Sequence, residues 1–472
     1  MTPTRPLLVL LFGLLVLASP ASGEDRRQPS GRIQPWNENA FYWQYHGKPV
    51  LLVGGSDDDN LFQWPAERLE RQLDLLARTG GNYIRNTMSD RRDQGFEVYA
   101  FRQLPDGRYD LNEWNPEYWK RFHRLLQWTS QRNIIVQIEI WDRFDYSDHS
   151  GRNRWQQHPY NPKNNVNYSY EESGFARQYT QHPGANRQPF FFTTPRQRNN
   201  AVVLKYQQRF VEKMLSIALP FDNVLYCIDN ETSGEEEWAR YWAQFIRERA
   251  EQAGKRVCIT EMWDDWNVTG GRHLRTYDHP ELYDFVDISQ NNHNKRDRHW
   301  NNVLEVRRYL LKQPRPINTV KTYGADGNKF GHTDNDAIER VWRHLLAGCA
   351  SVRFHRPPAG LGLNPKAQAT IRAVRHVEQL VRFWSLHPAP DRLLDRRDNE
   401  AYAAIRPGEA HVVYFPAQGD VRLKSKQGKW QLTWIDVSSG TRKGSTIVQS
   451  DGALRLRTPT DGHWVAVLRR QP

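Results

Sequence analysis

Cysteine is scarce in this chain, with only 3 among 472 residues. Cys227, Cys258 and Cys349 all lie in apolar segments, and so few cysteines cannot build a disulfide framework. The fold must therefore rest on an ordinary hydrophobic core, in which these thiols are small buried apolar groups. No cysteine or histidine group has the spacing of a zinc site. We accordingly predict neither a metal ion nor any other cofactor.

Long apolar runs are also missing, with one exception near the start of the chain. Arg5 precedes an apolar stretch over residues 7–17, and small residues follow at 21–23. This is the pattern of a secretory signal peptide, and the stretch is too short to cross a bilayer as a helix. We therefore predict a signal peptide over residues 1–23, no membrane span, and a secreted or periplasmic protein.

Acidic residues are outnumbered, with 54 Asp and Glu against 66 Lys and Arg. The predicted signal peptide contains one charged residue, Arg5, so its removal lowers the net charge from +12 to +11. A basic surface favours polyanions. The charge is spread along the chain and no nucleic-acid-binding motif is present, so we predict no nucleic-acid partner and keep an acidic glycan open. The 18 Trp, 20 Tyr and 19 Phe residues suit sugar faces, although large cores explain most of them.

Short β-type segments alternate with helical patterns through most of the chain. The strand candidates are residues 51–56, 82–88, 133–141, 223–229, 256–262, 285–291, 316–323 and 350–356, and the helical patterns are 65–80, a helix capped by Asn115, 199–218, 234–253, 301–312, 333–348 and 364–385. Eight strands, each followed by helical sequence, is the count of a (β/α)₈ barrel. An open doubly wound sheet is the competitor, but no glycine-rich dinucleotide fingerprint follows the first strand. We predict an α/β protein with a TIM barrel over residues 24–385.

The two ends of the predicted barrel carry β-structure. Before it, a strand pair with a turn at 46–48 would cover the barrel floor. After it, from about residue 386, the helical pattern stops. Short alternating segments follow, separated by turns such as Pro407-Gly408. They predict an antiparallel β-sandwich domain over residues 386–472.

One connection is unusually long. Residues 142–198 separate the third strand from the next helix and are rich in Tyr, Phe, Trp and His. Loops of this length in a compact domain are usually functional or disordered, and the aromatic content argues against disorder. The connection leaves the C-terminal end of a barrel strand, where such enzymes hold their sites. We predict a substrate-binding lid, with structural padding as the alternative.

Acidic residues crowd the end of the fourth strand, in LYCIDNETSGEEEW (225–238). Ser233 and Glu236 have the spacing of a capping box, and the acids at 235–237 would favour the dipole of a helix start. Asp229 and Glu231 come earlier, where a barrel presents catalytic groups. Strand alternation would place them on one face. Their structural alternative is a polar strand end that faces solvent.

The pair Asn230-Glu231 at this position resembles the large clan of (β/α)₈ retaining glycoside hydrolases. The resemblance implies that Asn230 binds the sugar 2-hydroxyl and that Glu231 is the acid/base. Arg85, in NYIRN, resembles the arginine that ends the second strand of that clan.

A narrower resemblance covers the whole mature chain. The segments HVVYFPAQGDVRL, WIDVSSG, DGHWVAVL, YGADG and AIERVWRHLLAGCASVRFH are similar to bacterial apiosidase-like proteins, which are barrels with a C-terminal β-sandwich that carries a collagen-binding label. In that group the fourth strand ends in an Asp, which falls on Asp229 and not on Glu231. Both residues therefore stay candidates for the acid/base.

The second carboxylate is missing from its expected place. The clan has its nucleophilic Glu at the end of strand seven, where this chain reads PINTVKTYG with Lys321. The best substitutes are Glu261, which ends strand five, and Glu139, on strand three. Neighbouring strands lie about 4.7–4.9 Å apart, and catalytic pairs need about 5–5.5 Å for retention or about 6.5–9.5 Å for inversion. Glu139 has a structural alternative, a buried ion pair with Arg85.

Further residues at the strand ends suit substrate binding through hydroxyl recognition, ring stacking or, for Arg356, pairing with an acidic sugar. With those already introduced, the predicted substrate-binding set is Asp57, Asp58, Arg85, Trp141, Asp142, Asn230, Trp263, Asn291, His293, Lys321, Tyr323, His355 and Arg356.

These features predict a secreted glycoside hydrolase that acts on a polysaccharide or other glycan. One carboxylic acid of raised pKa would protonate the departing oxygen, and a second carboxylate would attack the anomeric carbon or activate water. Lys321 keeps two alternatives open. One is a non-catalytic carbohydrate-binding or matrix protein on a degenerate barrel, and the other is a polysaccharide lyase whose base is Lys321, Tyr323 or a histidine. The pattern names neither the sugar nor the oligomeric state.

Overall fold

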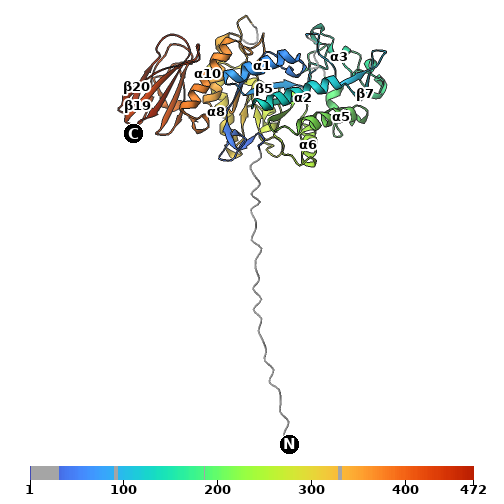
Figure 1. Ribbon diagram of the computed structural model, residues 1–472, viewed down its shortest axis with the longest axis horizontal. Coiled ribbons are helices and arrows are strands. Elements are labelled where there is room, and N and C mark those ends of the chain that lie inside the picture. The colour runs from blue at the N-terminus through green and yellow to red at the C-terminus, as the bar shows by residue number, and fades with distance from the viewer. Residues whose placement is uncertain (2–30, 90–93, 185–186, 328–331) are drawn as a thin grey trace.

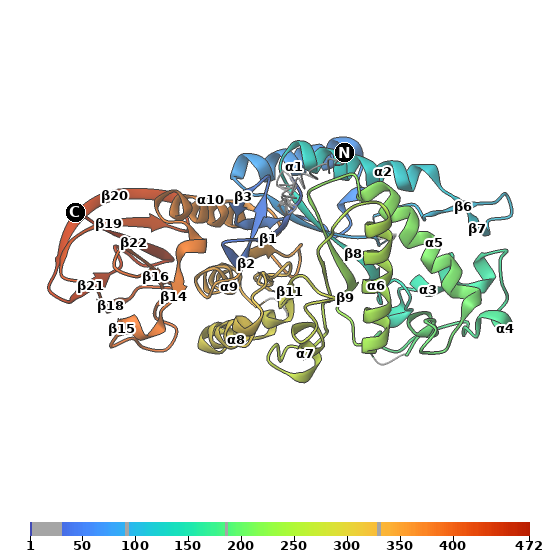
Figure 2. The ribbon, with the colours of Figure 1, turned by 90° about the horizontal axis from the view of Figure 1, so that it is seen from below.

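The computed structural model describes Met1 and residues 31–89, 94–184, 187–327 and 332–472. Apart from Met1, the predicted signal peptide falls on residues outside these ranges. The chain builds an α/β body and, at one end of it, a β-domain that contains β19 and β20 (Figures 1 and 2). Among the described residues, no helix combines the length and apolar character that a membrane crossing would need.

All eight predicted strands of the body are present and parallel. They are β4 (Leu52–Gly55), β5 (Tyr83–Thr87), β8 (Ile135–Asp142), β9 (Val224–Asn230), β10 (Ile259–Thr260), β11 (Val286–Asp287), β12 (Ile317–Asn318) and β13 (Ser351–Phe354). Six form one sheet in the order β10-β9-β8-β5-β4-β13, and β11 pairs with β12 alone. Backbone hydrogen bonding between strands therefore does not run continuously around the predicted barrel.

The interruption has a local cause between β10 and β11. The carboxylate of Asp284 accepts the backbone N–H of Ile259 at 3.0 Å, in place of a strand partner. Single backbone bonds still join the short pair to its neighbours, from Asp284 N to Ile259 O at 2.9 Å and from Ala350 N to Ile317 O at 2.8 Å. The eight strands thus keep the barrel order while the hydrogen-bonded sheet splits in two.

Helices follow the strands as the pattern predicts. They are α1 (Ala66–Thr79), α2 (Pro116–Gln131), α5 (Ala201–Ala218), α6 (Glu236–Gln252), α7 (Gly271–Tyr277), α8 (Arg296–Tyr309), α9 (Asp334–Leu346) and α10 (Pro365–Leu380). Asn115 caps α2 as predicted, through the N–H of Glu117, and Thr333 and Asp336 form a capping box at the start of α9. The sequence did not indicate α7, which opens on two glycines, residues that disfavour helix.

The predicted capping box at Ser233 is wrong. Helix α6 begins after Glu235, which makes no side-chain cap, and the Ser233 hydroxyl donates to the carbonyl of Gly184 at 3.3 Å. The reason lies one residue earlier: the N–H of Gly234 donates to the Thr232 hydroxyl at 3.0 Å, which turns the chain before the helix can start.

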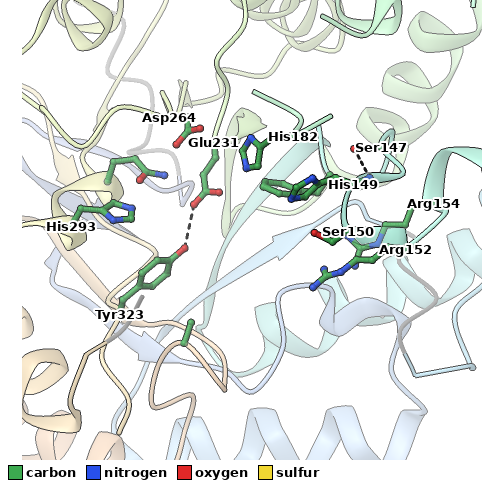
Figure 3. Close-up of a pocket in the computed structure, with 13 residues that line it drawn as sticks. Ser147, His149, Ser150, Arg152, Arg154, His182, Glu231, Asp264, His293 and Tyr323 are labelled. Carbon is green, nitrogen blue, oxygen red and sulfur yellow. Dashed lines mark hydrogen bonds between the residues drawn. The ribbon is translucent and has the colours of Figure 1, made fainter. Parts of the chain in front are cut away.

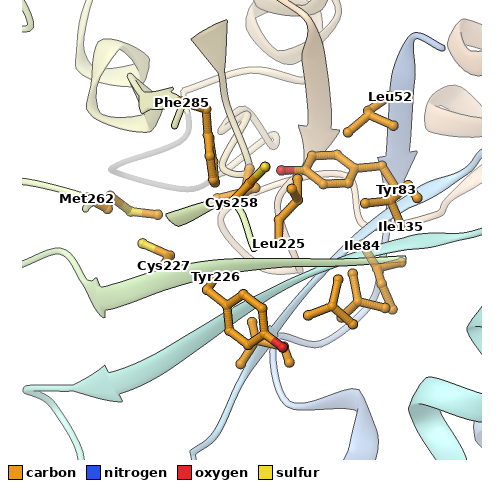
Figure 4. Packing of buried hydrophobic residues seen from close by; sticks show 14 of the residues in the cluster. Leu52, Tyr83, Ile84, Ile135, Leu225, Tyr226, Cys227, Cys258, Met262 and Phe285 are labelled. Atoms are coloured by element: carbon orange, nitrogen blue, oxygen red, sulfur yellow. The ribbon is translucent and has the colours of Figure 1, made fainter. Parts of the chain in front are cut away.

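The core of the body lies where the strands meet the surrounding helices. Figure 4 shows Leu52, Tyr83, Ile135 and Leu225 from four strands packed together, with Cys258 and Phe285 beside them. Each fully buried side chain of this size contributes about 1.5–3 kcal/mol through removal from water. All three cysteines are buried and free.

The floor of the body is covered by the N-terminal strands β1 (Gln34–Trp36), β2 (Asn39–Tyr45) and β3 (Lys48–Val50). Trp43 is fully buried, donates to Asn318 of β12 at 2.9 Å and lies against Phe285. The predicted strand pair with its turn at 46–48 is therefore present and closes the lower end of the barrel.

The C-terminal domain has two antiparallel sheets, as predicted. One has the order β14 (His387–Pro388), β16 (Tyr402–Arg406), β17 (Ala410–Phe415), β22 (Trp464–Arg470), β19 (Gly428–Asp436) and β20 (Thr441–Ser450); the other consists of β15 (Leu393–Leu394), β18 (Asp420–Lys424) and β21 (Ala453–Arg457). Strand β17 buries both faces, because Val413 and Phe415 join the sandwich core while Val412 and Tyr414 join the core of the body. The sandwich is therefore seated on the body by an apolar contact.

The long connection is ordered into short elements around aromatic side chains. These are η2 (His149–Gly151), α3 (Arg154–Gln157), η3 (Pro162–Asn164), α4 (Tyr170–Ser173) and η4 (Pro189–Phe192). Tyr146 stacks on Phe190 with ring centroids 4.0 Å apart, and Trp155 lies edge-on to Phe175 at 5.0 Å. A hairpin of β6 (Phe101–Gln103) and β7 (Tyr109–Trp114) lies beside it. We call residues 143–200 the lid.

Candidate active site

A cavity of about 570 Å³ opens beyond the C-terminal ends of the strands, beneath the lid. Its lining residues come from the loops after β9 to β13 and from the lid: Phe144, Ser147, His149, Ser150, Arg152, Arg154, His182, Glu231, Asp264, Gln290, His293, Tyr323 and Ala359 (Figure 3). A recess of about 160 Å³ adjoins it and reaches Asp59, Arg85, Asn230, Lys321, His355 and Arg356. This is the face on which (β/α)₈ proteins hold their sites.

Glu231 is the carboxylate that faces both the cavity and the recess. It follows β9 directly and has a left-handed backbone, with φ of 51°. Its carboxylate lies 2.6 Å from the Lys321 ammonium and accepts the Tyr323 hydroxyl at 3.2 Å. Burial acts to raise the pKa of Glu231, but the charge and hydrogen bond of Lys321 outweigh it, and with Arg85 they lower the pKa to about 2. Glu231 is therefore ionised at neutral pH.

Asp264 is the second carboxylate on the cavity wall and lies in the loop after β10. Its N–H donates to the carbonyl of Thr232 at 2.7 Å, which ties it to the strand end that carries Glu231 (Figure 3). Burial raises the pKa of Asp264, and the negative charge of Glu231 raises it further. Two carboxyl groups on one cavity thus have pKa values driven in opposite directions, the arrangement by which one can act as acid and the other as base.

Asp264 was missed at the sequence level. It stands in CITEMWDDW, three residues after Glu261, which was predicted to be catalytic. The signal that could have found it was the acidic pair 264–265 just past a strand end.

Asp229 and Glu261 do not line the cavity, which corrects their predicted placement. Both are fully buried, and the Trp238 indole of α6 donates to Asp229 at 2.9 Å, so Asp229 faces the helical layer. Strand alternation failed because the left-handed residue Glu231 breaks the extended backbone immediately after β9.

Glu139 is also buried and takes the structural alternative of an ion pair. Arg85 Nη2 lies 2.6 Å from its carboxylate. Burial raises the pKa of Glu139, against the opposing charges of Arg85 and Lys321. Of the four predicted catalytic residues, Glu231 alone lies on the cavity wall described above.

A network of charges and amides forms the floor of the recess. Asp59 accepts hydrogen bonds from Arg356 at 2.8 Å and from Arg353 at 3.1 Å, and its carboxylate lies 3.0 Å from Arg85 Nη1 in an ion pair. Burial acts to raise the pKa of Asp59, and these cations, with Arg85 the strongest, hold it well below its usual range. Asp59 belongs to the run of acids at the end of the first strand from which Asp57 and Asp58 were predicted to bind substrate, whereas Arg353 was not predicted from the sequence.

Asn230 is held on both sides of its amide by protein. Its Oδ1 accepts from Lys321 at 2.5 Å and from Arg85 at 2.8 Å, and its Nδ2 donates to Asp142 at 2.9 Å. Lys321, the residue at the place of the expected nucleophile, thus bridges Asn230 and Glu231. Burial lowers the pKa of Lys321, against the raising effect of Glu231.

The other nominated residues divide between the cavity and the interior. Tyr323 and His293 line the cavity, while His355 and Arg356 line the recess. Asp57 and Asp58 line a separate recess of about 240 Å³ on the far side of Asp59.

Four nominated residues are buried away from these openings. Trp141 is 1% exposed and lies among Phe190, Phe210, Trp238 and Trp242, and the Trp263 indole is buried and donates to Thr276. Asn291 and Asp142 are buried and form hydrogen bonds within the protein. Trp141 and Trp263 therefore stabilise the wall as core residues and offer no ring face to the cavity, contrary to the predicted stacking.

The lid contributes residues that sequence reasoning did not name individually. His149, Ser150, Arg152, Arg154 and His182 come from it, and Figure 3 shows them across the cavity from Tyr323. They stand in a stretch without periodic pattern, so no local signal singled them out. Within the described ranges, no three His, Cys, Asp or Glu side chains gather as a metal site would require.

The strand order, the helical layer and the cavity at the strand ends define a (β/α)₈ protein with a site beneath a lid. Among solved structures, a glycoside hydrolase family 5 protein from Bacteroides vulgatus ATCC 8482 shares the fold with a TM-score of 0.63 at 12% identity, over 93% of this chain and 94% of that chain. A second structure, described as a glycoside hydrolase, matches with a TM-score of 0.60 at 12% identity, over 93% and 97%. The chain matches no protein-family model, and no curated protein is similar to it in sequence.

These likenesses support the TIM barrel as the fold of the body. Because they cover 93% of the chain, they extend into the C-terminal β-domain as well. Neither description mentions an apiosidase or a collagen-binding domain, and that narrower resemblance stays a prediction.

Proposed function

We propose that the protein is a glycoside hydrolase that cleaves an O-glycosidic bond in a polysaccharide or other glycan. One observation carries the proposal: Glu231 and Asp264 face one cavity, and their surroundings lower the pKa of the first and raise the pKa of the second. The fold shared with glycoside hydrolases supports the same conclusion as an analogy.

The geometry assigns a role to each group. Asp264, whose raised pKa favours the protonated form, donates a proton to the departing glycosidic oxygen. Glu231, ionised, attacks the anomeric carbon or takes a proton from the attacking water, through an oxocarbenium-like transition state. The Lys321 ammonium and the Tyr323 hydroxyl hold the Glu231 carboxylate in one orientation.

Two finer features belong to the proposal. Export rests on the signal pattern over residues 1–23. Acceptance of acidic sugar units rests on Arg152, which is exposed, lines both the cavity and the recess, and is offered no ion pair by the described residues. Arg356 on the recess wall adds to the positive field there.

The test is release of sugar from a panel of neutral and acidic polysaccharides. We expect wild type to be active, and Glu231→Gln and Asp264→Asn each to lose about 10²–10⁴-fold in kcat, the usual contribution of an acid or base group. Glu235→Gln is the matched control, because Glu235 lies just outside the cavity in the same loop and pairs with Arg187. Full activity in either of the two variants would refute the assignment, and an inactive wild type would refute the reaction.

Lys321 favours a second candidate, a glycan-binding protein without catalysis. Its ammonium group forms an ion pair with the Glu231 carboxylate. The clan that this sequence resembles has its nucleophile at the position of Lys321. This candidate predicts that wild type binds oligosaccharides but releases no reducing ends. A lyase would instead produce unsaturated ends that absorb in the ultraviolet, so the same assay separates all three activities.

A further inference from the structure

Asp229 and Glu261 form a buried carboxyl pair between β9 and β10. Both side chains are fully buried. Glu261 Oε1 accepts the N–H of Asp229 at 3.1 Å and of Met262 at 2.8 Å, and Asp229 Oδ2 accepts the Trp238 indole N–H at 2.9 Å. The pair therefore links two strands and a helix of the layer behind them.

The pair needs a proton. The two carboxyl groups interact electrostatically with each other, and neither Asp229 Oδ1 nor Glu261 Oε2 accepts a hydrogen bond from the described residues. Two ionised carboxylates hold no hydrogen to share, and two bare charges in the interior would repel. One shared proton satisfies both free oxygens and leaves a single negative charge, which lies in the field of Arg143.

The pair also lies at the base of the two cavity carboxylates. Glu231 follows Asp229 by two residues, and Asp264 follows Glu261 by three. Beyond the pair, the strand ends stay joined by bonds from Thr232 N to Met262 O at 2.8 Å and from Asp264 N to Thr232 O at 2.7 Å. Any separation of the ends of β9 and β10 would therefore change the distance between Glu231 and Asp264.

We propose that Asp229 and Glu261 act as a proton-sharing clamp that joins β9 to β10 and so positions Glu231 and Asp264. The pair does not touch the cavity, so both are positioning residues. The significance for the reaction rests on the function proposed above, whereas the clamp itself does not.

The electrostatics of the surroundings agree with a retained proton. Burial, opposed mainly by Arg143, raises the pKa of Asp229 to about 7, and burial followed by the charge of Asp229 raises the pKa of Glu261 well above its usual range. Among the described residues, three other titratable groups face the pair: Arg143 of the lid, Cys227 of β9 and Tyr283 before β11. Burial raises the pKa of Cys227 and of Tyr283, so both stay neutral. Arg143 is the cation that favours ionisation.

The sign of the pH effect follows. A carboxyl with a raised pKa binds its proton more tightly in the folded protein, so its stabilisation is complete below the unfolded pKa, near 4. It is lost as pH rises through about 7. Wild type should therefore lose thermal stability progressively between about pH 4 and about pH 7 and level off above. In contrast, kcat follows the ionisation of the folded pair and should fall as pH rises through about 7, with KM unchanged.

Glu261→Gln tests the clamp, because an amide supplies the hydrogen without a titrating proton. We expect the decline of its melting temperature between about pH 4 and about pH 7 to be smaller than in wild type. Its kcat should also fall less as pH rises through about 7, with Asp229→Asn behaving alike. Glu235→Gln, an exposed control, should keep the wild-type decline. An unchanged decline in both amide variants would overturn the clamp, and this stability readout holds even if the protein hydrolyses no glycan.

A spectroscopic measurement covers the case in which the variants do not fold. Wild type at pH 6 should show the infrared C=O band of a buried protonated carboxyl, and the band should disappear by pH 9 in a reversible titration. If no such band is present at pH 6, the shared proton does not exist and the proposal fails.

Discussion

At the scale of single residues, the site depends on how one ammonium group divides its contacts. Lys321 Nζ contacts both Glu231 and Asn230, and it is almost completely buried. Its charge reverses the effect of burial on Glu231 and keeps that carboxylate ionised. The sequence shows only a lysine at a place where the resemblance to the clan predicts a glutamate, whereas the contact shows what the lysine does.

Lys321→Met removes this charge and should move the acid limb of activity. Without Lys321, burial raises the pKa of Glu231 instead of being outweighed. The pH below which kcat/KM falls should therefore rise by more than one unit, from a wild-type limb near the pKa of about 2. Lys312→Met is the control, since Lys312 is exposed and pairs with Asp278. A limb at the same pH in wild type and Lys321→Met would contradict the pairing.

At the scale of elements, the lid is a small aromatic core of its own. Trp155 is fully buried, lies against Phe175 and Tyr179, and donates its indole N–H to Ala176 at 3.0 Å. Arg154, which lines the cavity, directly precedes Trp155 in the chain. The order of the lid should therefore affect substrate affinity more strongly than it affects the rate of the chemical step.

Trp155→Ala should loosen the lid without unfolding the barrel. Loss of a buried Trp side chain costs about 3–5 kcal/mol, here confined to residues 143–200. We expect faster proteolysis within the lid and an increase of KM by about tenfold or more, with a smaller change in kcat. Val166→Ala, at an exposed lid position, should leave both unchanged. Cleavage of Trp155→Ala at the wild-type rate would show that Trp155 does not hold the lid.

At the scale of the whole molecule, one sheet of the C-terminal domain contributes side chains to both hydrophobic cores. The six-stranded sheet of the C-terminal domain, which contains β17, buries one face in the sandwich core. Its other face packs against α9 and α10 of the body. Trp342 of α9 stacks on Tyr414 of β17 with ring centroids 5.5 Å apart, and Arg396 pairs with Asp297 of α8. The sandwich is thereby joined to the body by apolar and charged contacts, and we expect the two to unfold together.

Tyr414→Ala should uncouple the two parts. It leaves a cavity in the contact and costs about 3–5 kcal/mol, as for other large aromatic truncations. Calorimetry should then show two transitions where wild type shows one, with activity lost in only one of them. Ile447→Ala on the exposed face of β20 is the control and should unfold as wild type does. A single transition in Tyr414→Ala would mean that this ring does not couple the domains.

The sequence by itself determined the eight strands of the body, the helices that follow most of them, the cap at Asn115 and the β-character of the C-terminal domain. These features follow from interactions within a few residues, such as alternation along a strand or a side chain bonded to the next turn. It also placed Glu231 at the site, because the end of a barrel strand is known from the strand alone.

Only the tertiary structure decided which carboxylates face the cavity. Asp229, Glu261 and Glu139 are as polar as Glu231 and Asp264, and they lie just as near strand ends, yet they point into the interior. Their direction depends on one left-handed residue, Glu231, and on partners distant in the chain: Trp238 for Asp229 and Arg85 for Glu139. The pKa values of the cavity carboxylates, which assign acid and base, likewise arise from burial and from charges that only folding brings together.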